Sequence, residues 1–443
     1  MRILVGTGLN QGAAEYRNIG DIAMLQVAVE RLAEIWPDAE ILVLTDSATD
    51  LTRFCPQTKP LSRCGAETWL LDGVITGPLH LVLPEWITFH IRRTKRWIRT
   101  HAPGMIDFLL RARFRLHDGE HRGPKVESFF RALRNCDLLV VAGCGGFADS
   151  CRAWNFYALG LIEVALAYDK KVALFGQGLG PLADREVLDR MREVLPRVSM
   201  FASRGTHGAE AIAAQLGIPK SVFATTGDDA VEPAYRLRSQ SLGNAIGVNL
   251  RIAPYSGIAE SHADAIGAVL CDFARRRNAD LLPLPIAQHS TADDRKSIGR
   301  LLGALSTSHA TPGPESPQAI YSETTRCRIV ITGAYHAAVF ALAQGIPTVC
   351  ISGTGYYAAK FRGLRELFGD GCEIVFLEEN DSTSSLIHSL EKAWNLSVDL
   401  RNALQEKACK QIQASRDAYR RVAELFPAAI RDSRSDPAIL SIP

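Results

Sequence analysis

Two glycine-rich segments of this sequence have the composition of anion-binding loops. Ala142-Gly-Cys-Gly-Gly-Phe147 follows one apolar run, and Phe175-Gly-Gln-Gly-Leu-Gly-Pro181 follows another. Glycine lets backbone N–H groups approach an anion closely, and a following helix adds the positive end of its dipole. Gly145, Gly146 and Gly178 are therefore candidates for backbone contact with an anion. Neither segment has the spacing of a Walker loop or a dinucleotide-binding loop, and each would equally serve as a tight turn.

Three basic side chains are placed where they could bind the same anion. Arg204 and Arg251 each follow a predicted strand, and Lys360 lies in a predicted helix of the second half. A guanidinium group binds a carboxylate or phosphate through two parallel hydrogen bonds, and an ammonium group adds a compact charge. Each residue taken alone would more often form a surface ion pair. Together they suit a small molecule with several negative charges.

His336 is the candidate for proton transfer. It stands shortly after a predicted strand and Gly333, at the start of an apolar helix. An imidazole can exchange a proton near neutral pH, so this residue could act as a general acid or base. The alternative is a histidine at a helix start that is hydrogen-bonded to a backbone carbonyl.

Four further polar residues could contact a second substrate. Asn18 and Asp21 lie at the start of the first predicted helix, where both residue types also cap helices. Gln288 and His289 belong to a polar loop that follows a strand of the second half. We expect these four residues to bind an acceptor.

Other acidic residues are assigned structural roles. Asp228 and Asp229 follow a strand in a Thr-Gly-Asp-Asp turn, where Asx-type hydrogen bonds are common. Asp293 precedes a predicted helix, and we expect it to cap that helix.

Alternating strands and helices must position these side chains. Most predicted strands are nearly continuous apolar runs, which is typical of parallel strands buried on both faces. They are Arg2–Val5, Ala39–Leu44, Asp137–Ala142, Lys171–Phe175, Val198–Ala202 and Val222–Thr225, then Ala245–Leu250, Asp280–Leu284, Arg328–Thr332 and Thr348–Ile351. The predicted helices include Asp21–Trp36, Ala153–Tyr168, Thr206–Leu216, Glu260–Arg276, His336–Gln344, Tyr357–Phe368 and Ser397–Leu425.

This order predicts an α/β protein with two doubly wound, Rossmann-like domains that face a cleft. We expect an N-terminal domain at 1–238, with an insertion at about 85–124, and a C-terminal domain at 239–396. A helical segment at 397–443 is expected to return to the first domain.

The composition excludes several classes of protein. Among 443 residues, 47% are hydrophobic and 22% are charged, which is the balance of a soluble globular protein. The formal net charge of +2 gives no general attraction to nucleic acid. The ten cysteines lack metal-binding spacing, and the N-terminal apolar run is too short for a signal peptide. We therefore expect a cytoplasmic protein without a metal, a cofactor or a nucleic-acid partner; the oligomeric state is left open.

Several short motifs, taken in order, resemble the polysaccharide pyruvyl transferase family from about residue 1 to residue 370. The family has a fold similar to the two-domain glycosyltransferase B architecture. The motifs are Asn18-Ile-Gly-Asp21, Gly143–Gly146, Gly176–Leu182, Ser203-Arg204, Thr226–Ala230, Gly333–Ala341, Gly345-Ile-Pro347, and Lys360 with Gly363.

The resemblance implies transfer of a pyruvyl group from phosphoenolpyruvate to two hydroxyls of a sugar. The product would be a cyclic ketal, and phosphate would be released. His336 takes the place of the family's motif histidine, Arg204 that of its arginine after the sixth strand, and Lys360 that of its lysine near the cleft. Phosphoenolpyruvate and a carbohydrate acceptor are the implied partners.

The sequence departs from the family pattern at two positions. The family commonly has arginine two residues before the motif histidine, where this chain has Ala334, and aspartate where it has Gly205. Arg326, Arg328 and Arg362 are candidates for the missing guanidinium group. Two other functions therefore stay open: a nucleotide-sugar-dependent glycosyltransferase of similar fold, and a family member without catalytic activity.

A basic, aromatic segment at 85–117 interrupts the alternation. Tryptophans and phenylalanines, among them Trp86, Trp97 and Phe108, alternate with arginines. Such a segment suits a helix on an anionic membrane surface, which would place the protein at the inner face of the membrane. It would equally suit an insertion whose aromatic rings pack on the first domain. Nucleic-acid binding comes third, because no recognition motif supports it.

Overall fold

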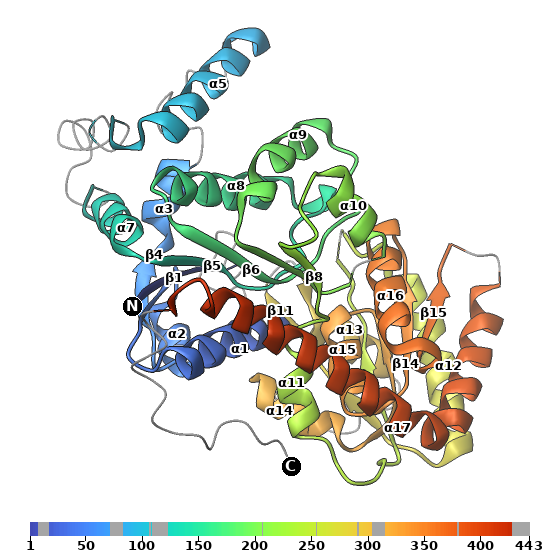
Figure 1. Ribbon diagram of the computed structural model, residues 1–443. Helices are drawn as coiled ribbons and strands as arrows, with labels where there is room; N and C mark the ends of the chain where they lie inside the picture. Colours follow the sequence, from blue (N-terminus) through green and yellow to red (C-terminus); the bar gives the residue numbers. More distant parts are fainter. Residues whose placement is uncertain are drawn as a thin grey trace.

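The computed structural model describes residues 1–7, 17–70, 83–105, 108, 123–205, 207–253, 255–289, 292–303, 315–378 and 381–427. Most of the second part of the basic segment, Met105–His117, therefore lies outside the described residues. Two parallel sheets with helices on both faces form the body of the molecule (Figure 1). The last strand of the first sheet ends at Thr225, and the first strand of the second begins at Ala245.

The described strands of the first domain form a seven-stranded parallel sheet in the order β4-β3-β1-β5-β6-β7-β8. Their bounds are β1 Arg2–Gly6, β3 Glu40–Thr45, β4 Lys59–Ser62, β5 Leu138–Val141, β6 Lys171–Gln177, β7 Met200–Ser203 and β8 Phe223–Thr225. Because helices cover both faces, Ile3, Leu4 and Val5 of the inner strand β1 are fully buried.

The helices of this domain divide between the two faces of the sheet. One face packs against α3 (Arg63–Leu70), α7 (Gly123–Asn135), α8 (Arg152–Ala167), α9 (Arg185–Val194) and α10 (Ala209–Gln215). The other packs against α1 (Ile19–Ile35), α2 (Ala48–Phe54) and the end of α17 (Ser382–Ala423).

The described strands of the second domain form a five-stranded parallel sheet in the order β10-β9-β13-β14-β15. Their bounds are β9 Ala245–Asn249, β10 Leu281–Pro283, β13 Cys327–Thr332, β14 Thr348–Ser352 and β15 Cys372–Phe376. Helix α12 (Glu260–Arg277) and the start of α17 cover one face, and α15 (Tyr335–Ala343) and α16 (Gly355–Phe368) cover the other. Shorter helices complete the domains: α11 (Val231–Arg236), α13 (Asp294–Leu302) and α14 (Pro317–Thr324). The two wound sheets confirm the predicted fold class.

A small antiparallel sheet that the sequence did not predict joins the two domains. It consists of β2 (Arg17–Asn18), β11 (Ala287–His289) and β12 (Ala292–Asp293). Asn18 pairs with Ala287, and the Ile19 N–H donates to the Ile286 carbonyl at 2.9 Å. The sheet therefore places the start of α1 against the second domain.

Helix α17 also spans both domains. The helix expected at Ser397–Leu425 is the C-terminal part of this longer element, which begins at Ser382 without a break at residue 397. Trp394 packs in the core of the second domain, and the Tyr419 ring stacks on Phe175 of the first sheet at 3.6 Å. Figure 1 shows α17 running along both domains in red.

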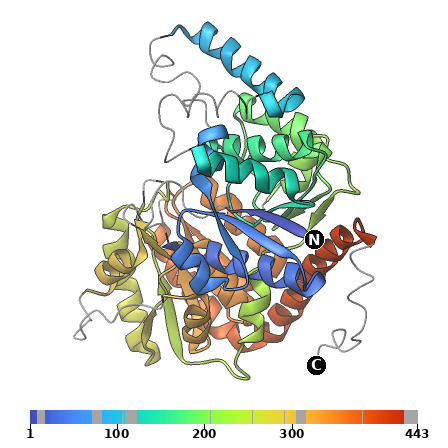
Figure 2. The same cartoon turned by 90° about the vertical axis from the view of Figure 1, so that its left-hand side faces the viewer.

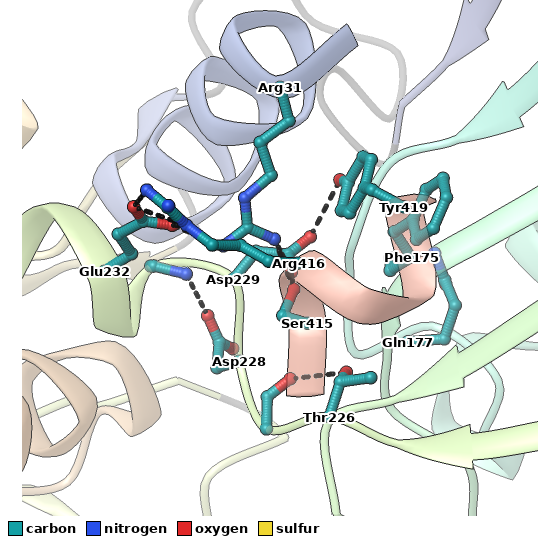
Figure 3. Close-up of polar contacts among 12 residues, drawn as sticks. Arg31, Phe175, Gln177, Thr226, Asp228, Asp229, Glu232, Ser415, Arg416 and Tyr419 are labelled. Carbon is teal, nitrogen blue, oxygen red and sulfur yellow. Dashed lines mark hydrogen bonds and ion pairs between the residues drawn. The ribbon is translucent and has the colours of Figure 1, made fainter. Parts of the chain in front are cut away.

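A buried ionic network fastens the end of α17 to the first domain (Figure 3). Arg31 of α1 pairs with Asp229 at 3.4 Å and with Glu232 at 2.6 Å. Ser415 and Tyr419 of α17 donate to the two oxygens of Asp229 at 2.5 and 3.1 Å. Burial raises the pKa of Asp229 above its ordinary value although Arg31 opposes it. Asp229 is thus structural, but through this buried network; the Asx-type turn hydrogen bond expected here is made by Asp228, which accepts from the Ala230 N–H at 2.9 Å.

Helix α5 (Glu85–His101) lies at the edge of the molecule in both views (Figures 1 and 2). It belongs to the predicted insertion and contacts α8.

Candidate functional site

Loops at the carboxyl ends of both sheets meet where the two domains join, which is where ligands bind in open α/β sheets. Arg204 follows β7 of the first domain, and His336 and Lys360 lie in α15 and α16 of the second. Glycines 145 and 178 come from the loops after β5 and β6. The structure therefore brings most of the residues predicted to bind a donor to one place.

Arg204 is buried at this junction, with 2% of its surface exposed. Its Nη1 atom lies 3.1 Å from an oxygen of Asp228, and its guanidinium plane lies over the Tyr335 ring at 4.2 Å. The ring belongs to the second domain. Arg204 is thus held by an ion pair within its own domain and by an aromatic contact across the junction.

The loop after β5 has little room for a side chain at Gly145. A Cβ atom at this position would lie 2.7 Å from the Lys360 Nζ atom and 2.8 Å from Arg204 Nη2. Both cations therefore reach the loop backbone, one from each domain. Any side chain at residue 145 would displace them.

Lys360 is the second cation of the site. Its Nζ atom lies over the rings of Tyr356 at 3.9 Å and Tyr357 at 5.4 Å, and Tyr356 donates across the junction to the Gly145 carbonyl at 2.9 Å. Within the described part of the chain, Lys360 has no hydrogen bond or ion pair. Burial, together with the nearby Arg204, lowers the pKa of Lys360 to about 7.

His336 lies beside Arg204. Its Nε2 atom is 3.4 Å from Arg204 Nη1 and 3.6 Å from an Asp228 oxygen. Its ring packs on Gly20, where a Cβ atom would lie 1.8 Å from Nδ1. Burial alone would raise the pKa of Asp228, but His336 and Arg204 hold it below its ordinary value. The expected structural aspartate is thus also a direct partner of two site residues.

Asp21, in the first turn of α1, is a second acidic side chain of the site. Its carboxylate makes no hydrogen bond or ion pair with another residue that the structure describes. Burial raises its pKa, and the charges of His336, Arg204 and Lys360 oppose that rise. Asn18, in contrast, caps α1 through a 3.0 Å hydrogen bond from the Gly20 N–H to its side chain.

Arg251, predicted to bind the donor, is engaged by the second domain. Its Nε and Nη2 atoms contact the two oxygens of Asp294 at 3.0 and 2.8 Å. Its Nη1 atom lies 3.4 Å from the Tyr357 hydroxyl. Arg251 therefore borders the site through Tyr357, with most of its charge neutralised by a buried carboxylate.

Three other predicted residues lie in less direct positions. The Gly178 N–H already donates to the Cys144 carbonyl at 2.8 Å, so it is not available to an anion. Gly146 packs on Trp154, where a Cβ atom would approach a ring carbon to 2.3 Å. Gln288 is buried on β11, in the small sheet, and the side chain of His289 lies outside the described residues.

None of the three arginines considered for the missing guanidinium group lies at the junction. Arg326 pairs with Glu323, Arg328 lies over the Trp394 ring at 4.8 Å, and Arg362 lies over the Phe376 ring at 5.2 Å. Arg328 cannot reach the junction because it contacts Trp394 in α17, and that helix covers the sheet face opposite α15. Ala334 itself is fully buried.

Sequence reasoning missed the aromatic residues of the site, Tyr335, Tyr356 and Tyr357. The available signal was their position, since one directly precedes His336 and the pair lies within four residues of Lys360. Tyrosines at a helix start were not recognised as partners for cations, although aromatic faces attract arginine and lysine.

The described residues contain no group of three or more His, Cys, Asp or Glu side chains that could hold a metal ion. Among the described helices, none combines the length and the apolar character needed to cross a membrane.

Comparison with known protein families shows the family to which the chain belongs. The model of the polysaccharide pyruvyl transferase family matches residues 18–354. The chain belongs to this family. Its membership confirms the resemblance predicted from the motifs and identifies the protein as a transferase of the pyruvyl transferase type. A search of curated proteins found no match.

Solved structures with a similar fold belong to other enzymes. The UDP-GlcNAc 2-epimerase from Neisseria meningitidis, bound to UDP-GlcNAc, has a TM-score of 0.55 at 10% identity, over 96% of this chain and 100% of that one. A putative UDP-N-acetylglucosamine 2-epimerase from Listeria monocytogenes has a TM-score of 0.52 at 11% identity, over 97% of each chain. Anabaena HepE, in complex with UDP and glucose, has a TM-score of 0.50 at 11% identity, over 97% of this chain and 100% of that one. At these identities the likeness shows the glycosyltransferase B type of fold alone.

Proposed function

We propose that this pyruvyl transferase moves the pyruvyl group of phosphoenolpyruvate onto two hydroxyls of a glycan or lipid-linked sugar, forming a cyclic ketal. The observation that supports this best is the meeting of Arg204 and Lys360, from different domains, at the backbone of Gly145. Phosphoenolpyruvate carries a phosphate and a carboxylate, so it matches two cations in a partly buried place.

The two cations differ in how free they are to bind a donor. Lys360 forms no ion pair with another described residue, and Arg204 keeps Nη2 directed at Gly145 while Nη1 pairs with Asp228. In the proposal, these two groups bind the phosphate and carboxylate oxygens. Arg251, neutralised by Asp294, contributes to the field without direct binding.

His336 and Asp21 supply the proton transfers of the proposed reaction. His336, whose Nε2 atom lies 3.6 Å from an Asp228 oxygen, gives a proton to the methylene carbon of the donor. One sugar hydroxyl attacks the resulting cationic carbon and gives its proton to Asp21. Phosphate then leaves, and the second hydroxyl closes the ketal while its proton passes to the departing phosphate. The atoms balance without a metal or another cofactor.

A nucleotide-sugar-dependent glycosyltransferase is the second candidate, favoured by the UDP and UDP-GlcNAc complexes of proteins with similar folds. Arg204 and Lys360 would then face a diphosphate. The donor requirement separates the two functions, since only the first consumes phosphoenolpyruvate.

The decisive experiment measures phosphate release from phosphoenolpyruvate with a panel of glycan acceptors, followed by mass spectrometry of the acceptor for a pyruvyl ketal. His336→Ala is expected to reduce the rate about 10²-fold or more, because a general acid contributes that much. The matched control His388→Ala changes an exposed histidine of α17 and should leave the rate unchanged. Release of UDP from a nucleotide-sugar, with no consumption of phosphoenolpyruvate, would overturn the proposal.

A further inference from the structure

An exposed aromatic and basic stripe runs along α5. It consists of Trp86, His90, Arg93, Trp97 and His101, which are spaced so that they lie on one face of the helix. All five are exposed, and Trp86 and Trp97 keep 68% and 58% of their surface accessible. The Trp97 and His101 rings stack at 4.9 Å, so the stripe is continuous at its C-terminal end. We call these five residues the α5 stripe.

Other residues attach α5 to the body. The Nε atom of Arg96 lies 2.8 Å from an oxygen of the buried Glu163 in α8, and Arg96 also pairs with Glu193. Ile98 packs against the core of the first domain. The helix is therefore held from a different side, and its two tryptophans do not pack on the domain as one interpretation of the sequence expected.

The exposure of both tryptophans requires an explanation. Three other tryptophans, Trp36, Trp154 and Trp394, keep 6% or less of their surface exposed. Water is an unfavourable environment for a large indole ring, so two such rings on one helix face indicate a surface that is covered in use.

The charge of α5 identifies what covers it. Residues 85–101 contain five lysines and arginines against a single acid, Glu85, and the α5 stripe has no carboxylate. Indole rings prefer the boundary between water and hydrocarbon, and basic side chains are attracted to anionic headgroups. We propose that α5 docks the protein on an anionic lipid bilayer through this stripe.

Such docking would hold the enzyme at the surface where a lipid-carried sugar acceptor is present. That link to the acceptor rests on the proposed function, whereas lipid binding by α5 does not.

Vesicle co-sedimentation of the full chain tests the inference. The protein should sediment at low salt with phosphatidylcholine vesicles that contain phosphatidylglycerol, and much less with phosphatidylcholine alone. The double variant Trp86→Ala/Trp97→Ala should bind at least about tenfold more weakly, since it loses both interfacial rings. Arg93→Glu should weaken binding by about 30-fold, because it removes one attracted charge and adds one that is repelled.

Two matched variants control for loss of exposed surface or of charge elsewhere. Val398→Ala changes a residue of α17 that is 63% exposed, and Arg275→Glu changes a residue of α12 whose side chain is 75% exposed. Both variants should bind vesicles like the wild type. Phosphate release with a soluble acceptor should be unchanged in the double variant, so that a failure of docking is distinguished from a failure of the proposed reaction.

Three outcomes would overturn the inference. The first is no sedimentation of the wild type with anionic vesicles, or equal sedimentation of the double variant. The second is a change of oligomeric state in the double variant without lipid, which would assign the stripe to a second copy of the chain. The third is tighter binding to a single-stranded oligonucleotide than to vesicles at the same salt.

Discussion

The charge of Lys360 provides the sharpest test of the site. Burial and the nearby Arg204 lower its pKa from the ordinary value of 10.5 to about 7. This reduction corresponds to roughly 5 kcal/mol against the charged form of Lys360 in the free enzyme. A bound donor offsets that cost, because a phosphate or carboxylate oxygen beside Nζ favours the ammonium form.

The pKa gives the direction of the pH dependence. As the pH rises through about 7, free enzyme loses the Lys360 proton and with it one donor-binding charge. We therefore expect kcat/KM for phosphoenolpyruvate to fall up to about tenfold per pH unit on the alkaline side. Lys360→Arg keeps its charge throughout and should remove this alkaline decrease. Lys360→Met should reduce kcat/KM by about 10²-fold below neutral pH, the value of a charge-assisted hydrogen bond.

Initial rates of phosphate release across the neutral pH range provide the assay, and Lys410→Met, which changes an exposed lysine of α17, is the control. Chemical denaturation adds an independent measurement. Lys360→Met should unfold at the same or higher denaturant concentration than the wild type, since it no longer buries a cation. An alkaline decrease of the same midpoint in the wild type and in Lys360→Arg would refute the assignment of Lys360 to the donor.

Three further predictions concern positioning and stability. Gly20→Ala places a Cβ atom 1.8 Å from the present position of His336 Nδ1, so kcat should fall by about 10²-fold, whereas Gly299→Ala, with open space around it, should have no effect. Arg31→Ala removes the arginine that pairs with the buried Asp229, while Glu232 keeps Arg236 and Arg416, and it should lower the free energy of unfolding by about 3–5 kcal/mol in urea denaturation; a loss below about 1 kcal/mol would contradict the buried network. Tyr356→Phe removes the hydrogen bond across the domain junction and should raise KM for phosphoenolpyruvate about 2- to 10-fold at nearly unchanged kcat; an unchanged KM would show that this bond does not shape the donor site.

Much of the fold was predictable because its signals are local. Apolar runs such as Lys171–Phe175 become strands within two or three residues of the expected ends, since burial on both faces demands continuous hydrophobicity. Among the strands, two kinds were not predicted. The edge strands β4 and β15 carry polar or charged residues, and the short strands β2, β11 and β12, of two or three residues each, have no pattern of their own.

The sequence predicted which residues belong to the candidate site better than it predicted the contacts that they make. Arg204, His336 and Lys360 were selected before their contacts were known, and the structure brings them together. The pairing of Arg251 with Asp294 depends on a fold that joins residues 43 positions apart, which no spacing rule encodes. For the same reason Asp228 was expected to shape a turn only, although its carboxylate also faces Arg204 and His336.

The sequence by itself determined the α/β alternation, the family motifs and the surplus of positive charge in α5, because each depends on residues close together in the chain. The tertiary structure alone decided which cations are neutralised by a buried carboxylate on two sides, as Arg251 is, and which keep a nitrogen directed at the Gly145 backbone. Lys360 and Arg204 meet at Gly145 because two separately folded sheets turn their carboxyl ends toward each other. Whether a charge is neutralised depends on what lies within a few ångströms of it, and that is a property of packing between distant segments.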